Sequence, residues 1–141
     1  MMNKPGKFTT AFILLTLSLL SACATAPQKD VNSIIAERAQ ARWDALLSMD
    51  YAAAYAFYSP GFRSTASVTD FEISIRLRRI RWTSAEYLKH DCDENTCKVF
   101  VRLGYKVATP VPGVKVWEGF DAVEEQWVKT GGEWWFMPAE Q

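Results

Sequence analysis

The segment 41–62, which reads ARWDALLSMDYAAAYAFYSPGF, constrains the fold of this chain more than any other segment. It predicts the end of one helix, a turn at residues 48–50 and a second helix over residues 51–58, because the aspartate that ends the turn can cap the second helix. The second helix is apolar on every side, which is typical of a buried helix. Proline disfavours helix at the residue before it, so Ser59-Pro60-Gly61 is expected to close this helix and the next residues to be extended.

A longer helix is expected over residues 31–47. Asp30 or Asn32 can cap its first turn, because both side chains accept hydrogen bonds from free backbone N–H groups. Apolar side chains recur with the helical period along one stripe: Val31, Ile34, Ile35, Ala39, Trp43, Leu46 and Leu47. Charged and amide side chains, including Arg42, occupy much of the remaining surface, which we expect to face solvent.

Residues 69–80 support two interpretations. From residue 71 to 78, apolar and polar side chains alternate strictly, which favours a strand. Thr69-Asp70-Phe71-Glu72 matches a capping box, which favours a helix that begins at Thr69. Periodicity alone favours the strand, whereas the family resemblance described below favours the helix, which we expect.

The rest of the chain predicts strands. Apolar side chains at every second position of 99–107 predict a strand with one face inward. The segments 82–92, 116–129 and 133–137, which turn-forming residues separate, are expected to be the other strands. The Gly-Gly pair at 131–132 predicts a tight hairpin between the last two segments. Helices followed by antiparallel strands indicate an α+β domain, with two to three N-terminal helices packed on one face of the sheet.

The N-terminus has the pattern of a secretion signal. Lys4 and Lys7 precede thirteen uncharged residues, 8–20, and this run is shorter than the about 20 residues that span a membrane. It ends in Leu20-Ser21-Ala22-Cys23, which resembles the lipobox of bacterial lipoproteins. The resemblance implies that residues 1–22 are a signal peptide and that Cys23 is acylated, for example with palmitate. The alternatives are an ordinary signal peptide with an incidental cysteine, or a short buried apolar helix.

Residues 23–30 then form the lipidated cysteine and a flexible tether, and residues 31–141 form the domain. Ala24, rather than aspartate, follows the cysteine, and in lipoprotein sorting this implies the outer membrane of a Gram-negative bacterium, with the domain facing the periplasm. Removal of the signal leaves fourteen basic against sixteen acidic residues, so neither the charge nor the location favours binding of nucleic acid. The expected membrane contact is through the N-terminal lipid.

Cys92 and Cys97 remain once Cys23 carries lipid. They flank a four-residue turn between two expected strands, and the periplasm is oxidising, so we expect a disulfide between them. Closing so short a loop stabilises a fold by about 2 kcal/mol. A metal site that adds His90, Asp91 and Asp93 to the two cysteines is the alternative, but the spacing is not a standard zinc pattern, and we expect no metal.

Two clusters of like charge stand out in the second half of the chain. The basic cluster is Arg76, Arg78, Arg79 and Arg81, and the acidic cluster is Glu118, Asp121, Glu124 and Glu125. The basic cluster is either an anion-binding patch, for phospholipid headgroups or an acidic ligand, or a solvated helix face. We favour a solvated face whose arginines pair with the acidic side chains of the sheet.

The helix pair ARWDALLSMDYAAAYAFYSPGF and the closing hairpin EEQWVKTGGEWWFMP resemble the NTF2-like superfamily, and within it small proteobacterial lipoproteins of unassigned function. The resemblance covers roughly residues 31–138. It implies a cone-shaped fold in which helices and a curved antiparallel sheet enclose an apolar pocket, and dimerisation or partner binding through the sheet face. The residues expected to line this pocket are Tyr51, Tyr55, Tyr58, Trp82 and Trp127.

The expected function is a non-catalytic module that binds a small apolar ligand or a protein partner, without a cofactor. The alternative is an isomerase- or cyclase-like enzyme that uses a pocket tyrosine and a carboxylate. The available residue types are Tyr55, Tyr58, Asp70 and Glu125, but no motif places them, and no catalytic residue is assigned. His90, the only histidine, is expected to be exposed near a hairpin tip.

Overall fold

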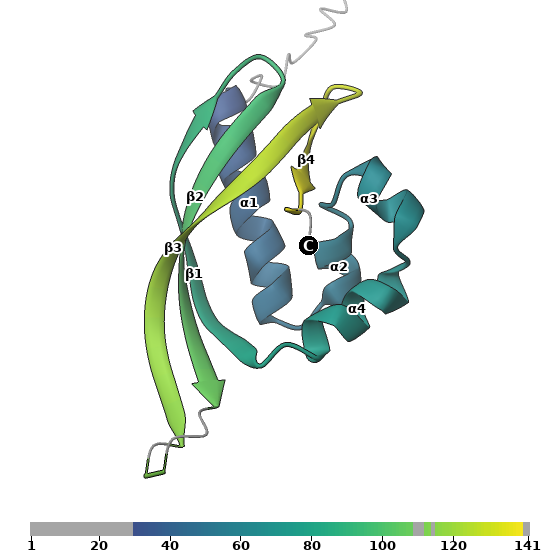
Figure 1. The fold of residues 1–141 in the computed structure, drawn as a ribbon. Helices are drawn as coiled ribbons and strands as arrows, with labels where there is room; N and C mark the ends of the chain where they lie inside the picture. The colour runs from purple at the N-terminus through teal and green to yellow at the C-terminus, as the bar shows by residue number, and fades with distance from the viewer. Residues whose placement is uncertain (1–29, 109–111, 114, 140–141) are drawn as a thin grey trace, which may run out of the picture.

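The computed structural model describes residues 30–108, 112–113 and 115–139. Within these residues the helices come first and an antiparallel sheet follows (Figure 1). The helices are α1 (Val31–Leu47), α2 (Tyr51–Tyr55), α3 (Pro60–Thr65) and α4 (Val68–Arg76). The strands are β1 (Ile80–Cys92), β2 (Thr96–Ala108), β3 (Val116–Thr130) and β4 (Glu133–Met137). The sheet order is β1-β2-β3-β4, so each strand pairs with the next one along the chain.

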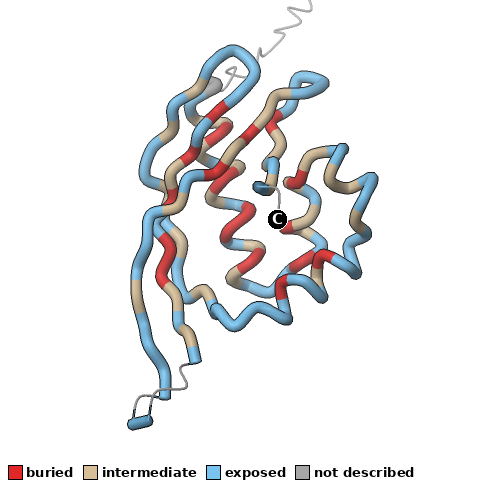
Figure 2. Tube along the Cα trace, in the orientation of Figure 1, coloured by how far each residue is buried: buried red, intermediate tan, exposed pale blue. Residues whose placement is uncertain are grey.

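Helix α1 lies against the sheet and carries much of the core. Its first turn is capped by the Asp30 carboxylate, which accepts a hydrogen bond from the Asn32 N–H, as the sequence predicts. The apolar side chains that it buries follow the helical period: Ile35, Ala39, Trp43 and Leu46. They meet the buried side chains of β2, which are Cys97, Val99, Val101 and Leu103. The buried positions of both elements are red in Figure 2.

Helix α2 is shorter than predicted and is followed by another helix. Asp50 caps α2 as expected, but the helix ends at Tyr55 and its Ala52 is exposed, so it is not buried on every side. Ser59 begins α3, because its hydroxyl accepts from the Phe62 N–H while proline occupies the first helical position. Proline costs nothing at this position, since its missing N–H would have no partner there. The prediction that Ser59-Pro60-Gly61 closes a helix before an extended segment is therefore wrong.

Helix α4 settles the ambiguity at residues 69–80 in favour of helix, with strand only from Ile80. Its N-cap is Ser67 and not Thr69. The Ser67 hydroxyl accepts from the Asp70 N–H at 3.1 Å, and the Asp70 carboxylate accepts from the Ser67 N–H at 3.2 Å. This reciprocal pair is a capping box that begins two residues before the predicted one.

The sheet is built from three long strands and one short strand. The β3–β4 hairpin turns at Gly131 and Gly132, whose φ angles of 63° and 84° suit a tight two-residue turn, as predicted. Strands β1, β2 and β3 bend around α1, and the β2–β3 hairpin extends beyond the helices (Figure 1). Along this extension the sheet has no helix over it, and Trp117 and Phe120 are 56% and 74% exposed.

The predicted NTF2-like cone with two to three helices is wrong. The described residues form four helices, three of them shorter than ten residues, and a four-stranded sheet in simple sequential order. The segments used for the resemblance, an apolar helix pair and an aromatic hairpin, specify local structure but not how the elements assemble. The error follows from treating local patterns as evidence for a global arrangement.

The proposed signal peptide, Cys23 and the tether up to residue 29 lie outside the described residues. In the described part of the chain, no helix combines the length and the apolar character needed to cross a membrane.

Candidate functional site

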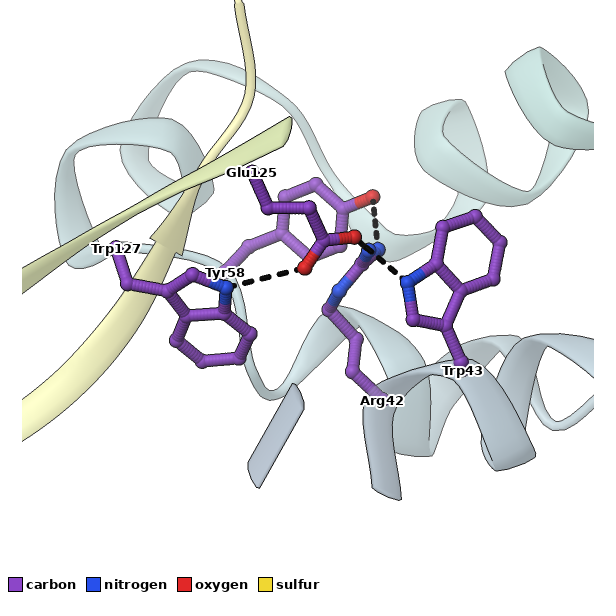
Figure 3. A network of polar contacts seen from close by, with 5 residues as sticks. All are labelled: Arg42, Trp43, Tyr58, Glu125 and Trp127. Carbon is purple, nitrogen blue, oxygen red and sulfur yellow. Dashed lines mark hydrogen bonds and ion pairs between the residues drawn. The ribbon is translucent and has the colours of Figure 1, made fainter. Parts of the chain in front are cut away.

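A buried ion pair joins the helices to the sheet. Arg42 on α1 and Glu125 on β3 are 2% and 4% exposed, and the Arg42 guanidinium donates to Glu125 Oε1 (Figure 3). Taking two charges out of water is costly, so such a pair persists only where further hydrogen bonds hold both groups. The surrounding side chains supply these bonds for the carboxylate.

Two indole groups complete the coordination of Glu125. The Trp43 Nε1–H donates to Oε1 at 2.6 Å, and the Trp127 Nε1–H donates to Oε2 at 3.1 Å. Figure 3 shows the two indoles on opposite sides of the carboxylate. Both oxygens therefore have donors, and the negative charge is held by one cation and two neutral N–H groups.

The Arg42 guanidinium lies among aromatic rings. Its central carbon is 3.9 Å from the centroid of the Phe136 ring and 4.7 Å from that of Trp43. One of its N–H groups donates to the Tyr58 hydroxyl at 3.4 Å, while its Nε is buried and has no hydrogen-bond partner among the described residues. Cation–π contact with a ring this close partly replaces the lost hydration of the charge.

Backbone pairing after α2 fixes the position of Tyr58. The Ser59 N–H donates to the Phe136 carbonyl at 2.9 Å, and the Phe136 N–H donates to the Phe57 carbonyl at 2.8 Å. This parallel bridge attaches the end of the α2 segment to β4. The Tyr58 ring consequently packs edge-on to the Phe136 ring at 4.9 Å, with its hydroxyl beside Arg42.

The hydroxyl of Tyr58 is buried next to positive charge. Burial raises its pKa above the ordinary value of 10.0, while the cationic Arg42 and Arg78 act in the opposite direction. Tyr58 accepts from Arg42, and its own proton has no acceptor among the described residues. The hydroxyl is therefore neutral near pH 7 and retains an unused hydrogen-bond donor.

A cavity of about 490 Å³ lies between the helices and the sheet, against the buried ion pair. Its walls are mainly apolar: Trp43, Leu46, Ile75, Ile80, Trp82, Leu103, Val123, Phe136 and Met137. Its polar lining is Arg42, Tyr58, Arg78, Glu124, Glu125 and Gln126. Apolar walls with few convergent polar groups are the usual composition of small-molecule sites.

Two further cavities adjoin this one. A cavity of about 440 Å³ shares Tyr58, Ile75 and Arg78 with it and is also lined by Asp70. Another, of about 430 Å³, lies near the start of α2 and is lined by Tyr51, among others. Tyr58 and Arg78 thus stand between the two cavities that flank them.

The structure separates the five residues expected to line a pocket. Tyr58 and Trp82 line the 490 Å³ cavity, and Tyr51 lines the 430 Å³ cavity. Tyr55 lines none of these three cavities, and its hydroxyl donates to the Ala66 carbonyl at 2.6 Å. Trp127 is completely buried behind Glu125, where it acts as a hydrogen-bond donor.

Sequence reasoning missed Arg42 as a site residue and assigned it to the solvated face. The signal was present in its position. Arg42 lies seven residues after Ile35 and four before Leu46, which places it on the buried stripe of α1 at the helical period. The prediction assigned Arg42 to solvent because its side chain is charged, although its position lies on the buried stripe. Its partner on β3 could not be identified from helical periodicity.

Cys92 and Cys97 are opposite each other in the β1–β2 pair, and a disulfide joins them. No group of three or more possible metal ligands lies together in the described part of the chain. His90 is partly buried rather than exposed. Its ring nitrogens lie 2.6 Å from the Tyr87 hydroxyl and 2.9 Å from Asn32 Oδ1, so it connects β1 to the start of α1.

The basic cluster does not pair with the acidic one. Arg76 forms an ion pair with Glu72 within α4 at 2.8 Å, and no described carboxylate lies in ion-pair contact with the other three arginines. Glu118, Glu124 and Glu125 pair instead with Lys106, Lys98 and Arg42. The expected arginine–carboxylate pairing is therefore wrong, and Arg78, which stacks on Trp82 at 5.7 Å, keeps an unpaired charge beside the cavity.

Two solved structures that resemble this chain are of proteins that contain a SEC-C motif. One, from Rhodopseudomonas palustris, has a TM-score of 0.52 and 13% identity over 69% of this chain and 70% of its own. Another, from Psychrobacter arcticus, has a TM-score of 0.52 and 12% identity over 80% of this chain, which spans only 63% of that protein. At these identities the similarity concerns the fold alone.

Neither a protein-family model nor a curated protein matches the chain. The predicted membership of the NTF2-like superfamily is wrong, because these two similar structures are of SEC-C motif proteins and no family model or curated protein supports it.

Proposed function

We propose that this protein is an outer-membrane lipoprotein, anchored through Cys23, whose periplasmic domain binds a small apolar molecule without transforming it. The observation that carries the binding part is the 490 Å³ cavity, in which mainly apolar walls surround a few polar groups. This volume falls within the range of about 300–1,000 Å³ that is usual for small-molecule sites. The anchor rests on the Leu20-Ser21-Ala22-Cys23 sequence.

The state of Glu125 favours binding over catalysis. A general base needs a lone pair that can reach the substrate. Here one oxygen accepts from Arg42 and Trp43 and the other accepts from Trp127, so proton abstraction would require these bonds to break. A tyrosine and a carboxylate do meet at the cavity, as an isomerase- or cyclase-like enzyme would need, but the carboxylate is committed to holding the fold together.

A substitution that fills the cavity tests the binding function. Val123 lines the cavity, whereas its neighbour Ala122 lies on the opposite, solvent-facing side of β3. Val123→Phe should abolish binding of an apolar fluorescent probe, because the ring occupies the space the probe needs. Ala122→Phe adds the same ring to the protein surface and should leave probe binding unchanged. Equal probe binding by both variants would place the apolar site elsewhere and contradict the proposal.

The anchor is tested separately. Cys23→Ser should abolish metabolic labelling with palmitate and release the protein from membranes, because no thiol remains for the lipid. Continued labelling of the variant would refute the assignment of Cys23.

A further inference from the structure

We infer that the ligand of the 490 Å³ cavity is a single-chain apolar carboxylate, with its anionic group at Arg78 and Tyr58 and its apolar part against Trp82 and Leu103. The inference rests on the proposed binding function and specifies its ligand. It depends on two unused groups at one place, the charge of Arg78 and the hydroxyl proton of Tyr58.

Among the described side chains that carry charge at the 490 Å³ cavity, only Arg78 has no opposite charge in ion-pair contact. Three carboxylates line the two cavities that share Tyr58 and Arg78: Asp70, Glu124 and Glu125. At the 490 Å³ cavity, Glu124 pairs with Lys98 at 3.3 Å, and Glu125 pairs with Arg42 and accepts from the two indoles. Asp70 lines only the 440 Å³ cavity, where it accepts hydrogen bonds from Ser67. Arg42 is neutralised by Glu125, so Arg78 supplies the uncompensated positive charge of the cavity lining.

Arg78 is suited to an anion by its position as well as its charge. It is exposed, so it lies where the cavity meets solvent, and its guanidinium is held over the Trp82 ring at 5.7 Å. An amphipathic ligand can keep its ionised end at this mouth, partly hydrated, while its chain enters the apolar interior. Arginine also presents parallel N–H groups that match the two oxygens of a carboxylate.

Tyr58 adds a neutral donor on the inner side of Arg78. Its hydroxyl already accepts from Arg42, so the hydrogen bond that it can still make is one that it donates. A carboxylate can accept from Tyr58 and from Arg78 at once, whereas an ammonium group can accept from neither. A bound cation would therefore be disfavoured for two reasons. The charge of Arg78 repels it, and the Tyr58 hydroxyl proton remains without an acceptor.

The test uses the full-length lipoprotein in phosphatidylcholine liposomes, with protein-free liposomes as the blank. Octanoate, 1-octanol and octylammonium carry the same chain with an anionic, a neutral and a cationic end. Binding is followed by the change in intrinsic tryptophan fluorescence, since two of the six tryptophans, Trp43 and Trp82, line the cavity. We expect octanoate to bind about tenfold more tightly than octanol, because a hydrogen bond to a charged group commonly contributes a factor of this size, and octylammonium to bind most weakly.

Three variants test the role of Arg78. Arg78→Gln should reduce octanoate affinity to that of octanol, while Arg78→Lys should keep much of the preference because it keeps the charge. Arg79→Gln removes an adjacent arginine that lines none of the three cavities and should change nothing. Equal binding of octanoate and octanol, or a preference for octylammonium, would overturn the assigned ligand while leaving apolar binding intact. Absence of saturable binding by all three compounds would overturn the binding function itself.

Discussion

Arg42 and Glu125, 83 residues apart in the chain, form a buried ion pair that ties helix α1 to strand β3. The pair is also the polar side of the cavity, so the same contact supports the fold and shapes the candidate site. Its energetic role follows from its burial, because an ion pair that is removed from water is most costly when only one partner remains.

Glu125→Gln should therefore destabilise the domain by about 3–5 kcal/mol, since it leaves the charge of Arg42 buried without a counter-ion. The measurement is the free energy of unfolding from denaturant titration. Glu124→Gln is the matched control, because Glu124 is exposed and its ion pair with Lys98 contributes about 0–1 kcal/mol. Similar small losses in both variants would show that the buried pair does not hold the fold together.

The helix cap at Ser67 gives a second prediction. Ser67→Ala should cost about 1 kcal/mol, because the Asp70 N–H then loses its side-chain acceptor. Thr69→Ala alters the residue that the sequence pattern suggested as the cap, and it should leave the free energy of unfolding nearly unchanged. A larger loss from Thr69→Ala than from Ser67→Ala would contradict the observed start of α4.

The two candidate caps show why the sequence predicted elements better than boundaries. Both Ser67-Val68-Thr69-Asp70 and Thr69-Asp70-Phe71-Glu72 fit the capping pattern, and the structure uses the first. Phe71 and Ile75 would lie in the helix in either frame, so the apolar pattern does not locate the first residue of the helix. At Pro60 the same local signal could either end a helix or begin one. Segments with a long consistent period, such as α1 and β2, were predicted correctly because many residues repeat the same information.

The candidate site was harder to predict because its members come from separate elements. The sequence predicted Tyr58 as a pocket-lining residue, but its hydrogen bond with Arg42 depends on the backbone bridge between Tyr58 and Phe136. The pairing of Arg42 with Glu125 depends on the register of α1 against β3. Neither contact produces a periodic pattern in the sequence. The sequence alone could therefore assign each residue to a helix or strand, but it could not show that the residues meet in one site.

Acid should weaken the cap of α4. Hydrogen bonds from the Ser67 hydroxyl and N–H lower the pKa of Asp70 below its ordinary value of 3.8. A lowered folded-state pKa gives stability that is present above the ordinary value and is lost as the pH falls through the folded value. The difference in unfolding free energy between the wild type and Asp70→Asn should therefore shrink below about pH 3.8. A difference that stays constant through this range would contradict the effect.

The disulfide between Cys92 and Cys97 should contribute modestly to stability. Opening so short a loop is expected to cost about 2 kcal/mol, because little chain entropy is gained in the unfolded state. Unfolding titrations with and without reductant measure this cost. The Cys92→Ala/Cys97→Ala variant is the control and should show no response to reductant. Two free thiols in the protein isolated from its native cells would show that the bond does not form in the cell.

Alkaline pH should lower the free energy of unfolding through ionisation of the Tyr58 hydroxyl. Burial raises its folded-state pKa above 10.0, so the folded protein binds the hydroxyl proton more tightly than the unfolded chain does. This contribution is complete below the unfolded-state value and is lost as the pH rises through the folded-state value. Tyr58→Phe removes the ionising group, so its unfolding free energy should fall less steeply above pH 10 than that of the wild type. Tyr55→Phe is the comparison, since the Tyr55 hydroxyl bonds to backbone carbonyls away from Arg42. An alkaline slope that is unchanged in Tyr58→Phe would show that this hydroxyl ionises as freely in the folded protein as in the unfolded chain, and it would contradict the raised pKa.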